Sequence, residues 1–437
     1  MNENKPKTSY SHIIWLSSLF LGVVLLGLCC ILRAKPAMAT LFIFLINYLF
    51  VHMLQDFLTP VSPEKLPNLA VLTANQWGKK LLRPADDGLN NLEGVKIALF
   101  GVEEDRTGQT ECFLAPDTIR RQLYLLYNWE PGFAIADLGN IVAGNTRSDT
   151  CFAVQKVVAA LLREGIIPIL MGGTHDVSYA QFLGHAEAES STSVVVFDEK
   201  IDLFTTPAET GAEDLSPDGF LYPLLTRKLN LSGFAHIGYQ RYLTDPEMVN
   251  TLENLHFECY SLGEIRNNIE EVEPLVRHAQ MISLDLSCLR AADAPGAVAL
   301  SSNGLFAEEA CRIARYAGLS DHVTSIGFYQ FNPPQDLQDQ TARLIAHMIW
   351  YFAEGVMNRK GEQPETDKRT YLTYIVNFKD SDHEIAFFKS KKSGRWWMKV
   401  PVRKKYTLIP CSYSDYETAC KDEIPDRWMK AFLRFNN

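Results

Sequence analysis

The sequence has no CxxC pair, although it contains nine cysteines in 437 residues. Two of them, Cys29 and Cys30, lie in an apolar N-terminal stretch, which leaves an odd number for the rest of the chain. An odd set without paired spacing does not fit a disulfide framework. We therefore expect free thiols in a reducing compartment.

An excess of positive charge is also absent. The chain has 42 lysines and arginines against 52 aspartates and glutamates, so its formal net charge is -10. Proteins that bind nucleic acids usually carry a basic face, and this balance argues against such a partner. There is no internal repeat and no low-complexity tract. The hydrophobic fraction of 47% is ordinary for a globular protein, and the length allows one large or two ordinary domains.

Two apolar runs precede the rest of the chain. Residues 13–32 carry no charge and are long enough to span a bilayer as a transmembrane helix, whereas residues 41–54 are short for a span. Three interpretations compete: a membrane hairpin over residues 13–54, a signal peptide cleaved near residues 37–39, or translated leader upstream of a true start at Met53. We favour the third. The protein would then be cytoplasmic, or membrane-anchored with its remainder in the cytoplasm if residues 13–54 are retained.

Strand and helix patterns alternate from Val95 to Phe352. Short, branched apolar runs bounded by turn residues alternate with helical patterns, which is typical of a doubly wound, mostly parallel α/β domain. We assign this domain to residues 53–360. After it, residues 371–378 and 384–400 predict antiparallel strands and residues 413–434 a helical tail, so residues 361–437 form a β-hairpin/helix appendage.

Polar residues follow three of the predicted strands. His175 comes after the apolar run 166–171, Asp198 and Asp202 follow the run 194–197, and Asp285 ends the strand 281–286. Open α/β sheets bind ligands at the carboxyl ends of their strands. One imidazole with three carboxylates suits Mn²⁺ or a similar divalent ion. The simpler alternatives are a histidine bonded within its own turn and aspartates that cap the next helix.

These motifs resemble those of the ureohydrolase family, which includes arginase, agmatinase and formimidoylglutamase. The family signatures GGDHS, DAHxD and SxDxDxxDPxxxPG correspond to residues 172–176, 198–202 and 283–296, and the likeness extends over roughly residues 95–355. The C-terminal appendage resembles that of a bacterial formimidoylglutamase-like branch. The resemblance implies an arginase-like three-layer α/β/α fold, a homo-oligomer, and Mn²⁺-dependent hydrolysis of linear amidine or guanidine C–N bonds in a small-molecule substrate.

The departures from the family pattern concern the metal site. The resemblance implies a first ion at His175, Asp198, Asp202 and Asp285, all of which are present. A second ion would need the histidine of DAHxD and the second aspartate of SxDxD, and these positions hold Lys200 and Ser287. An ammonium has no lone pair to donate, and a serine is a poorer ligand than a carboxylate. We therefore expect one Mn²⁺ ion and not two.

Lys200 also suggests a replacement for the missing ion. Its ammonium is expected between Asp198 and Asp285, and these three residues are the predicted catalytic group. A salt-bridge role for Lys200 is an equal alternative.

Gln330 and Asn303 are predicted to contact the substrate. The alternative is that their side chains form hydrogen bonds within their own loops. A neutral Gln330, where some family members have a glutamate, weakens the case for a guanidinium substrate. The first hypothesis is hydrolysis of an amidine such as formimidoylglutamate with at most one intact metal half-site. The alternative is a catalytically inactive binding or scaffold protein with the same fold.

Overall fold

The computed structural model describes residues 53–436, apart from residues 84–91, 107–109, 130–131, 133, 190, 204–215, 228–229, 363, 380–383 and 404. The chain divides into two compact units, one of Met1–Asp56 with Leu89–Asn91 and one of Phe57–Gly88 with Leu92–Asn437. All labelled elements described below belong to the second unit.

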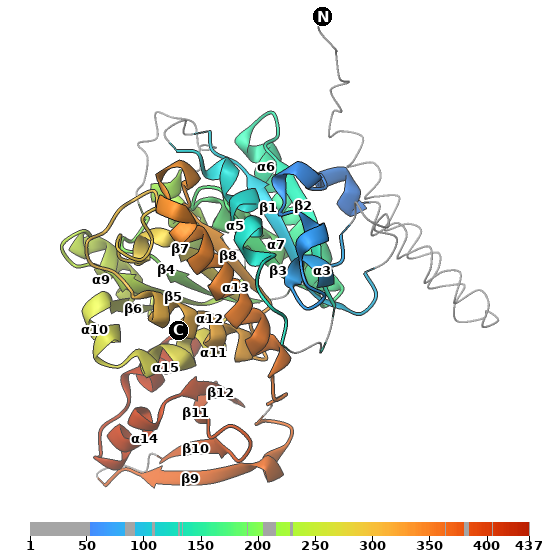
Figure 1. Cartoon of the computed structure of the whole chain (residues 1–437). Coiled ribbons are helices and arrows are strands. Elements are labelled where there is room, and N and C mark those ends of the chain that lie inside the picture. The colour runs from blue at the N-terminus through green and yellow to red at the C-terminus, as the bar shows by residue number, and fades with distance from the viewer. Residues whose placement is uncertain are drawn as a thin grey trace, which may run out of the picture. The chain divides into compact units, whose positions relative to one another are not determined.

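An eight-stranded sheet forms the centre of this unit (Figure 1). Its order is β2-β1-β3-β8-β7-β4-β5-β6, and every neighbouring pair is parallel. The strands are β1 (Val95–Glu103), β2 (Ala134–Val142), β3 (Ile167–Met171), β4 (Thr192–Phe197), β5 (Leu231–Tyr239), β6 (Glu258–Ser261), β7 (Met281–Asp285) and β8 (Ser325–Tyr329). The inner strands are buried along their whole length, because helices cover both faces of a parallel sheet.

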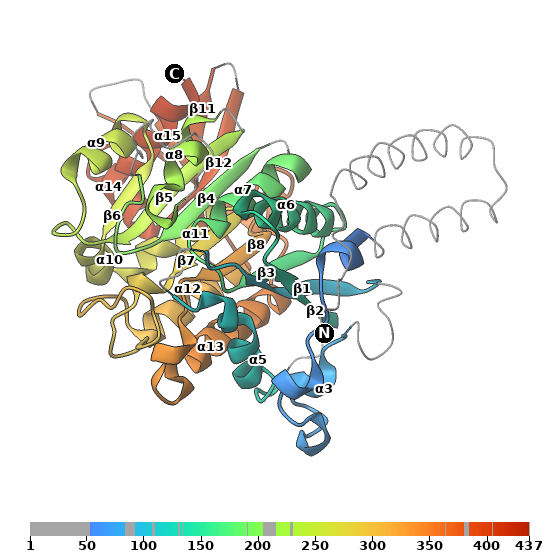
Figure 2. The same ribbon diagram turned by 90° about the horizontal axis from the view of Figure 1, so that it is seen from above.

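Alternate residues of each strand point to opposite faces, and each face packs against its own helices. On β4, Val195 and Phe197 belong to the larger hydrophobic cluster, whereas Val194 and Val196 belong to the smaller one. The larger cluster includes side chains of α5 (Ala115–Leu123), α10 (Leu262–Asn267), α11 (Val272–His278), α12 (Ala307–Leu319) and α13 (Gln340–Met357). The smaller one includes side chains of α7 (Val177–Ala188), α8 (Leu221–Thr226) and α9 (Pro246–Asn254). Figure 2 shows the resulting three layers, with α6 (Arg147–Arg163) beside α7.

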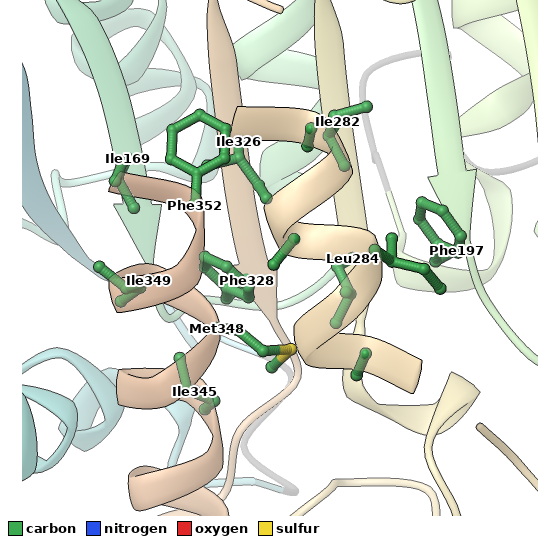
Figure 3. Close-up of a cluster of buried hydrophobic side chains, with 14 of the residues drawn as sticks. Ile169, Phe197, Ile282, Leu284, Ile326, Phe328, Ile345, Met348, Ile349 and Phe352 are labelled. Atoms are coloured by element: carbon green, nitrogen blue, oxygen red, sulfur yellow. The ribbon is translucent and has the colours of Figure 1, made fainter. Parts of the chain in front are cut away.

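Helix α13 covers the middle of the sheet. Its apolar positions recur at helical spacing and face the side chains of the central strands (Figure 3). The helix contributes Ile345, Met348, Ile349 and Phe352, and the strands contribute Ile169, Phe197, Ile282, Leu284, Ile326 and Phe328. The predicted doubly wound α/β architecture is confirmed.

The C-terminal appendage is larger than the predicted hairpin. It is a four-stranded antiparallel sheet of order β12-β11-β10-β9, formed by β9 (Tyr371–Asn377), β10 (Glu384–Ser390), β11 (Trp396–Val402) and β12 (Lys405–Cys411). Two helices, α14 (Tyr413–Cys420) and α15 (Asp426–Asn436), follow it. Side chains of both helices pack with the strands in a separate hydrophobic cluster.

The prediction of a transmembrane helix is corrected by the structure. Among the helices of the described residues, none is both long enough and apolar enough to cross a bilayer. The apolar runs on which the prediction rested, residues 13–32 and 41–54, lie outside the described residues except for Met53 and Leu54.

Candidate metal centre

The turn after β3 positions His175. Gly172 and Gly173 both have positive φ angles, of 86° and 81°, which glycine adopts without a steric penalty. The Gly172 amide donates to the carbonyl of Phe328 at 2.9 Å, and the Gln330 amide donates to the carbonyl of Gly173 at 3.0 Å. These bonds hold the turn against the end of β8, and α7 begins two residues after His175.

Three carboxylates from two other strand ends meet the His175 ring. Its Nδ1 atom lies 3.0 Å from Asp198 Oδ2, 3.1 Å from Asp202 Oδ2 and 3.2 Å from Asp285 Oδ2. All four residues are buried. The donor atoms of His175, Asp198 and Asp285 lie within 4.8 Å of one another, and within the described residues this is the group compact enough to hold a metal ion. Asp202 contacts the same nitrogen but lies outside that compact group.

The other side of the His175 ring is also fixed. Its Nε2 atom lies 3.1 Å from Ser283 Oγ, and its ring packs against Phe220 with centroids 4.4 Å apart. Ser283 is two residues before Asp285 on β7, so both side chains point to one face of the strand. The Ser283 contact leaves Nδ1 directed at the carboxylates.

The charges of this cluster are strongly perturbed. Burial opposes protonation of His175, but the neighbouring carboxylates of Asp285 and Asp198 outweigh it and raise the pKa of the ring. Burial, together with the charge of Asp198, raises the pKa of Asp202 and that of Asp285 well above the ordinary range. Burial acts in the same direction on Asp198, but the hydrogen bond and charge of His175 hold the pKa of that carboxyl below its usual value. Three carboxylates beside one imidazole leave an excess of negative charge, which suits a cation.

The two positions that depart from the family pattern behave differently from each other. Ser287 lies within the cluster: its hydroxyl donates to Asp198 Oδ1 at 2.8 Å, and its amide donates to Asp285 Oδ1 at 2.7 Å. The Lys200 ammonium lies 3.9 Å from Glu199 Oε1, and its side chain is 44% exposed. Among the described residues it forms no ion pair with Asp198 or Asp285, so the structure does not place it between them as predicted. Only the Lys200 amide, which donates to Asp198 Oδ1 at 3.2 Å, contacts the cluster.

The two predicted substrate contacts lie in different surroundings. Gln330 follows β8 with a φ of 64°, and its buried Oε1 has no hydrogen-bond partner among the described residues. Asn303 lies in an exposed loop, where its Oδ1 accepts from Arg266 Nη1 at 2.9 Å and its carbonyl accepts from Gln240 Nε2 at 2.7 Å. The structure thus leaves an acceptor free at Gln330, whereas the Asn303 oxygens are engaged by the loop.

Several neighbours of the cluster were not predicted from the sequence. The sequence does indicate Ser283, because a residue two positions before Asp285 lies on the same face of the strand. His236 on β5 is fully buried, and burial lowers its pKa to about 4, but a lone histidine in a strand gives no sequence signal of a site. Glu199 is buried beside Gln240, whose Nε2 donates to Glu199 Oε2 at 3.4 Å, and burial raises the pKa of Glu199.

Comparison with known families gives a match to one model. The model described as the arginase family matches residues 95–354, which is more than half of the chain. The formimidoylglutamase of Streptococcus gordonii is 24% identical over 309 residues, covering 65% of this chain and 92% of the relative. That of Staphylococcus haemolyticus is 24% identical over 279 residues, covering 61% and 88%.

Solved structures show the same fold. The formimidoylglutamase of Bacillus subtilis superposes with a TM-score of 0.55 at 22% identity, covering 61% of this chain and 89% of that chain. The formiminoglutamase of Trypanosoma cruzi, solved with Mn²⁺, gives a TM-score of 0.56 at 21% identity, covering 61% and 95%. At these identities the likeness establishes the architecture of the α/β domain and nothing finer.

Proposed function

Because the chain belongs to the arginase family, we propose that it binds a single Mn²⁺ ion and hydrolyses a C–N bond of a linear amidine. The family assignment made from the motifs is confirmed by the match over residues 95–354. The observation that carries the proposal is the convergence of three carboxylates on Nδ1 of His175.

The donor set fits the ion. Manganese accepts imidazole nitrogen together with carboxylate oxygen. The site offers one imidazole, that of His175, and three carboxylates, those of Asp198, Asp202 and Asp285. The Ser283 contact on the opposite ring nitrogen orients His175 for this role. Without a cation the buried carboxylates repel one another, as the raised pKa values of Asp202 and Asp285 indicate.

One ion is proposed because the second half-site lacks its ligands. Ser287 uses its hydroxyl to donate to Asp198, and Lys200 directs its ammonium to Glu199. A bound divalent ion supplies a Lewis acid that polarises the amidine and lowers the pKa of water. Gln330 offers a free, neutral acceptor to an amidine N–H, because its buried Oε1 has no other partner among the described residues.

Lys200 takes a different role from the one predicted. Its half-exposed ammonium is too far from Asp198 and Asp285 to pair with them, but it offers a positive charge to a carboxylate of a substrate at the end of β4. Relatives of this chain are named formimidoylglutamase, and formimidoylglutamate carries such carboxylates beside its amidine. It is therefore the first substrate to test.

A second candidate function is non-catalytic binding with the same fold. Lys200 and Ser287 favour it, because a bridged pair of ions activates water more strongly than a single ion. The two candidates share the metal site and differ in turnover.

Metal content and turnover together test the proposal. The purified protein is loaded with Mn²⁺, desalted and analysed by inductively coupled plasma mass spectrometry, and then assayed with formimidoylglutamate and a panel of guanidines. We expect one ion per chain and release of formamide. His175→Ala removes the ion, whereas His347→Ala, an exposed histidine on α13, retains it. Lys200→His combined with Ser287→Asp raises the content to two.

The outcomes separate the hypotheses. Two tightly bound ions in the unaltered protein contradict the single-ion site, and no ion at all contradicts the metal centre. One ion without turnover of any amidine or guanidine rejects the hydrolase and favours the binding protein.

A further inference from the structure

A small cavity lies where the C-terminal appendage meets the α/β domain. Helix α15 and strand β12 line it from the appendage, and α11 with the first halves of β4 and β5 line it from the domain. The metal centre is at the carboxyl ends of the strands, whereas Ser193 and Gly233, which line this cavity, are near the amino ends of theirs. The two sites are therefore separate. The cavity volume of about 40 Å³ is enough for roughly three water molecules or one small ion.

Helix α15 presents two arginines to this cavity. Arg427, Ala431 and Arg434 follow one another at spacings of four and three residues, so they share one face of the helix, and all three line the cavity. Arg427 is only 8% exposed. Its Nη2 donates to Glu271 Oε2 at 3.3 Å, but its buried Nε and Nη1 have no hydrogen-bond partner among the described residues. The buried Nε of Arg434 has none either.

The nearby carboxylates leave one of these cations without a counter-charge. Glu258, which also lines the cavity, pairs with the Lys430 ammonium at 3.1 Å. Asp415 lies 3.7 Å from Arg427 Nε. Within the part of the chain that the structure describes, Arg434 forms no ion pair. Charged groups that are taken out of water normally have a partner of opposite charge, because desolvation is costly.

A histidine on the domain side of the cavity responds to the same positive charge. Burial, followed by the charge of Arg434, lowers the pKa of the His278 imidazole to about 3, and Arg427 acts in the same direction. Burial also lowers the pKa of the Arg434 guanidinium, and the charge of Glu258 opposes this only in part. A water molecule would satisfy the free N–H groups but would leave the charge uncompensated. An anion does both.

We propose that this cavity binds one small monovalent anion, chloride or a small carboxylate such as formate, between Arg427 and Arg434. The anion accepts hydrogen bonds from the buried N–H groups of both arginines and supplies the counter-charge that Arg434 lacks. The volume favours an ion of this size over a phosphate ester. Because unfolding disperses the site, bound anion stabilises the folded protein, and the stabilisation grows with anion concentration.

Urea unfolding of the full chain tests the proposal, with sodium chloride or sodium formate replacing sodium gluconate at constant ionic strength and a fixed Mn²⁺ concentration. We expect the unfolding midpoint to rise and then level off, and the anion that acts at the lower concentration identifies the site as one for a halide or for a carboxylate. Arg434→Met removes this dependence. In gluconate the variant is at least as stable as the unaltered protein, because an unpaired charge is gone. Arg312→Met, at an exposed position of α12, is the matched control and keeps the full dependence.

A second variant supplies the anion from the chain itself. Ala431→Asp places a carboxylate four residues after Arg427 and three before Arg434, on the face of α15 that lines the cavity. Its midpoint should not depend on chloride or formate. Crystals grown in sodium bromide should show an anomalous peak between the two arginines in the unaltered protein, and none there in Ala431→Asp.

The outcomes decide between an anion and water. If chloride and formate raise the midpoint of the unaltered protein no more than that of Arg434→Met, the proposal is overturned. A bromide peak without this dependence shows an adventitious ion only and overturns it as well. If Arg434→Met does not fold, Ala431→Asp decides, because a chloride dependence that persists in it contradicts the site. None of these readouts depends on turnover or on the number of bound Mn²⁺ ions, so the proposed function and this proposal can fail separately.

Discussion

Replacement of Arg120 by methionine is expected to destabilise the fold strongly. This side chain is fully buried on α5, and its guanidinium donates to both carboxylate oxygens of Asp137, at 2.7 and 2.9 Å, and to the Gly139 carbonyl at 2.8 Å. A third carboxylate oxygen, that of Asp117, lies 3.2 Å away. The network joins α5 to the middle of β2.

The magnitude follows from what the substitution leaves behind. Asp117 keeps its ion pair with Lys65 at 2.8 Å, but among the described residues Asp137 keeps only the hydroxyl of Tyr124 and the amide of Gly139. Removing one partner of a buried ion pair costs about 3–5 kcal/mol. That is a large share of the roughly 5–15 kcal/mol by which native domains are stable.

Urea unfolding followed by circular dichroism measures the change. Arg315→Met is the matched control, because Arg315 is 42% exposed and its pair with Glu354 should contribute about 1 kcal/mol or less. Asp137→Asn added to Arg120→Met should recover part of the loss, since it removes the uncompensated charge. If Arg120→Met costs no more than Arg315→Met, the buried network does not stabilise the fold as argued.

Two further predictions concern the turn at the metal centre and the pH dependence of stability. Gly172→Ala should lower the free energy of unfolding by at least about 1 kcal/mol and also lower the Mn²⁺ content, because φ is 86° and the new Cβ would lie 2.8 Å from Pro116 Cδ. Gly263→Ala, whose new Cβ would meet nothing within 4 Å, should change neither the urea unfolding curve nor the Mn²⁺ content. Burial lowers the pKa of His236 to about 4, against about 6.5 when unfolded, so stability is lost as pH falls from about 6.5 towards 4. Between pH 7 and pH 5 the free energy of unfolding of His236→Leu, measured with urea, should therefore fall by about 2 kcal/mol less than that of the unaltered protein. An equal fall in the two proteins would refute this.

The sequence allowed the large elements to be predicted because their periodicity is strong. The buried run of β3 and the helix before it, which ends at Arg163 ahead of a glycine, are examples. Short elements were missed, among them β6, whose four residues carry too little pattern to separate strand from loop. In the appendage, β12 was missed because its lysine and proline reduce its strand signal.

Some features of the candidate site could likewise be predicted from the sequence, and others could not. His175, Asp198, Asp202 and Asp285 could be found because each follows an apolar run, and parallel strands bring their carboxyl ends together. The position of the Lys200 ammonium could not be found, because it depends on the path of the chain after β4 and on the carboxylate of Glu199. The engagement of Asn303 by Arg266, 37 residues away in sequence, was equally inaccessible.

The pairing of Thr59 and Leu82 with β2 has a practical consequence for any shortened version of the protein. Residues 95–354 account for the family match, yet a fragment cut to those limits would lose both segments that seal this margin of the large sheet. The freed amides and carbonyls of β2 would then be open to intermolecular pairing. Such a fragment should precipitate during expression, whereas one that starts before Thr59 should stay in solution.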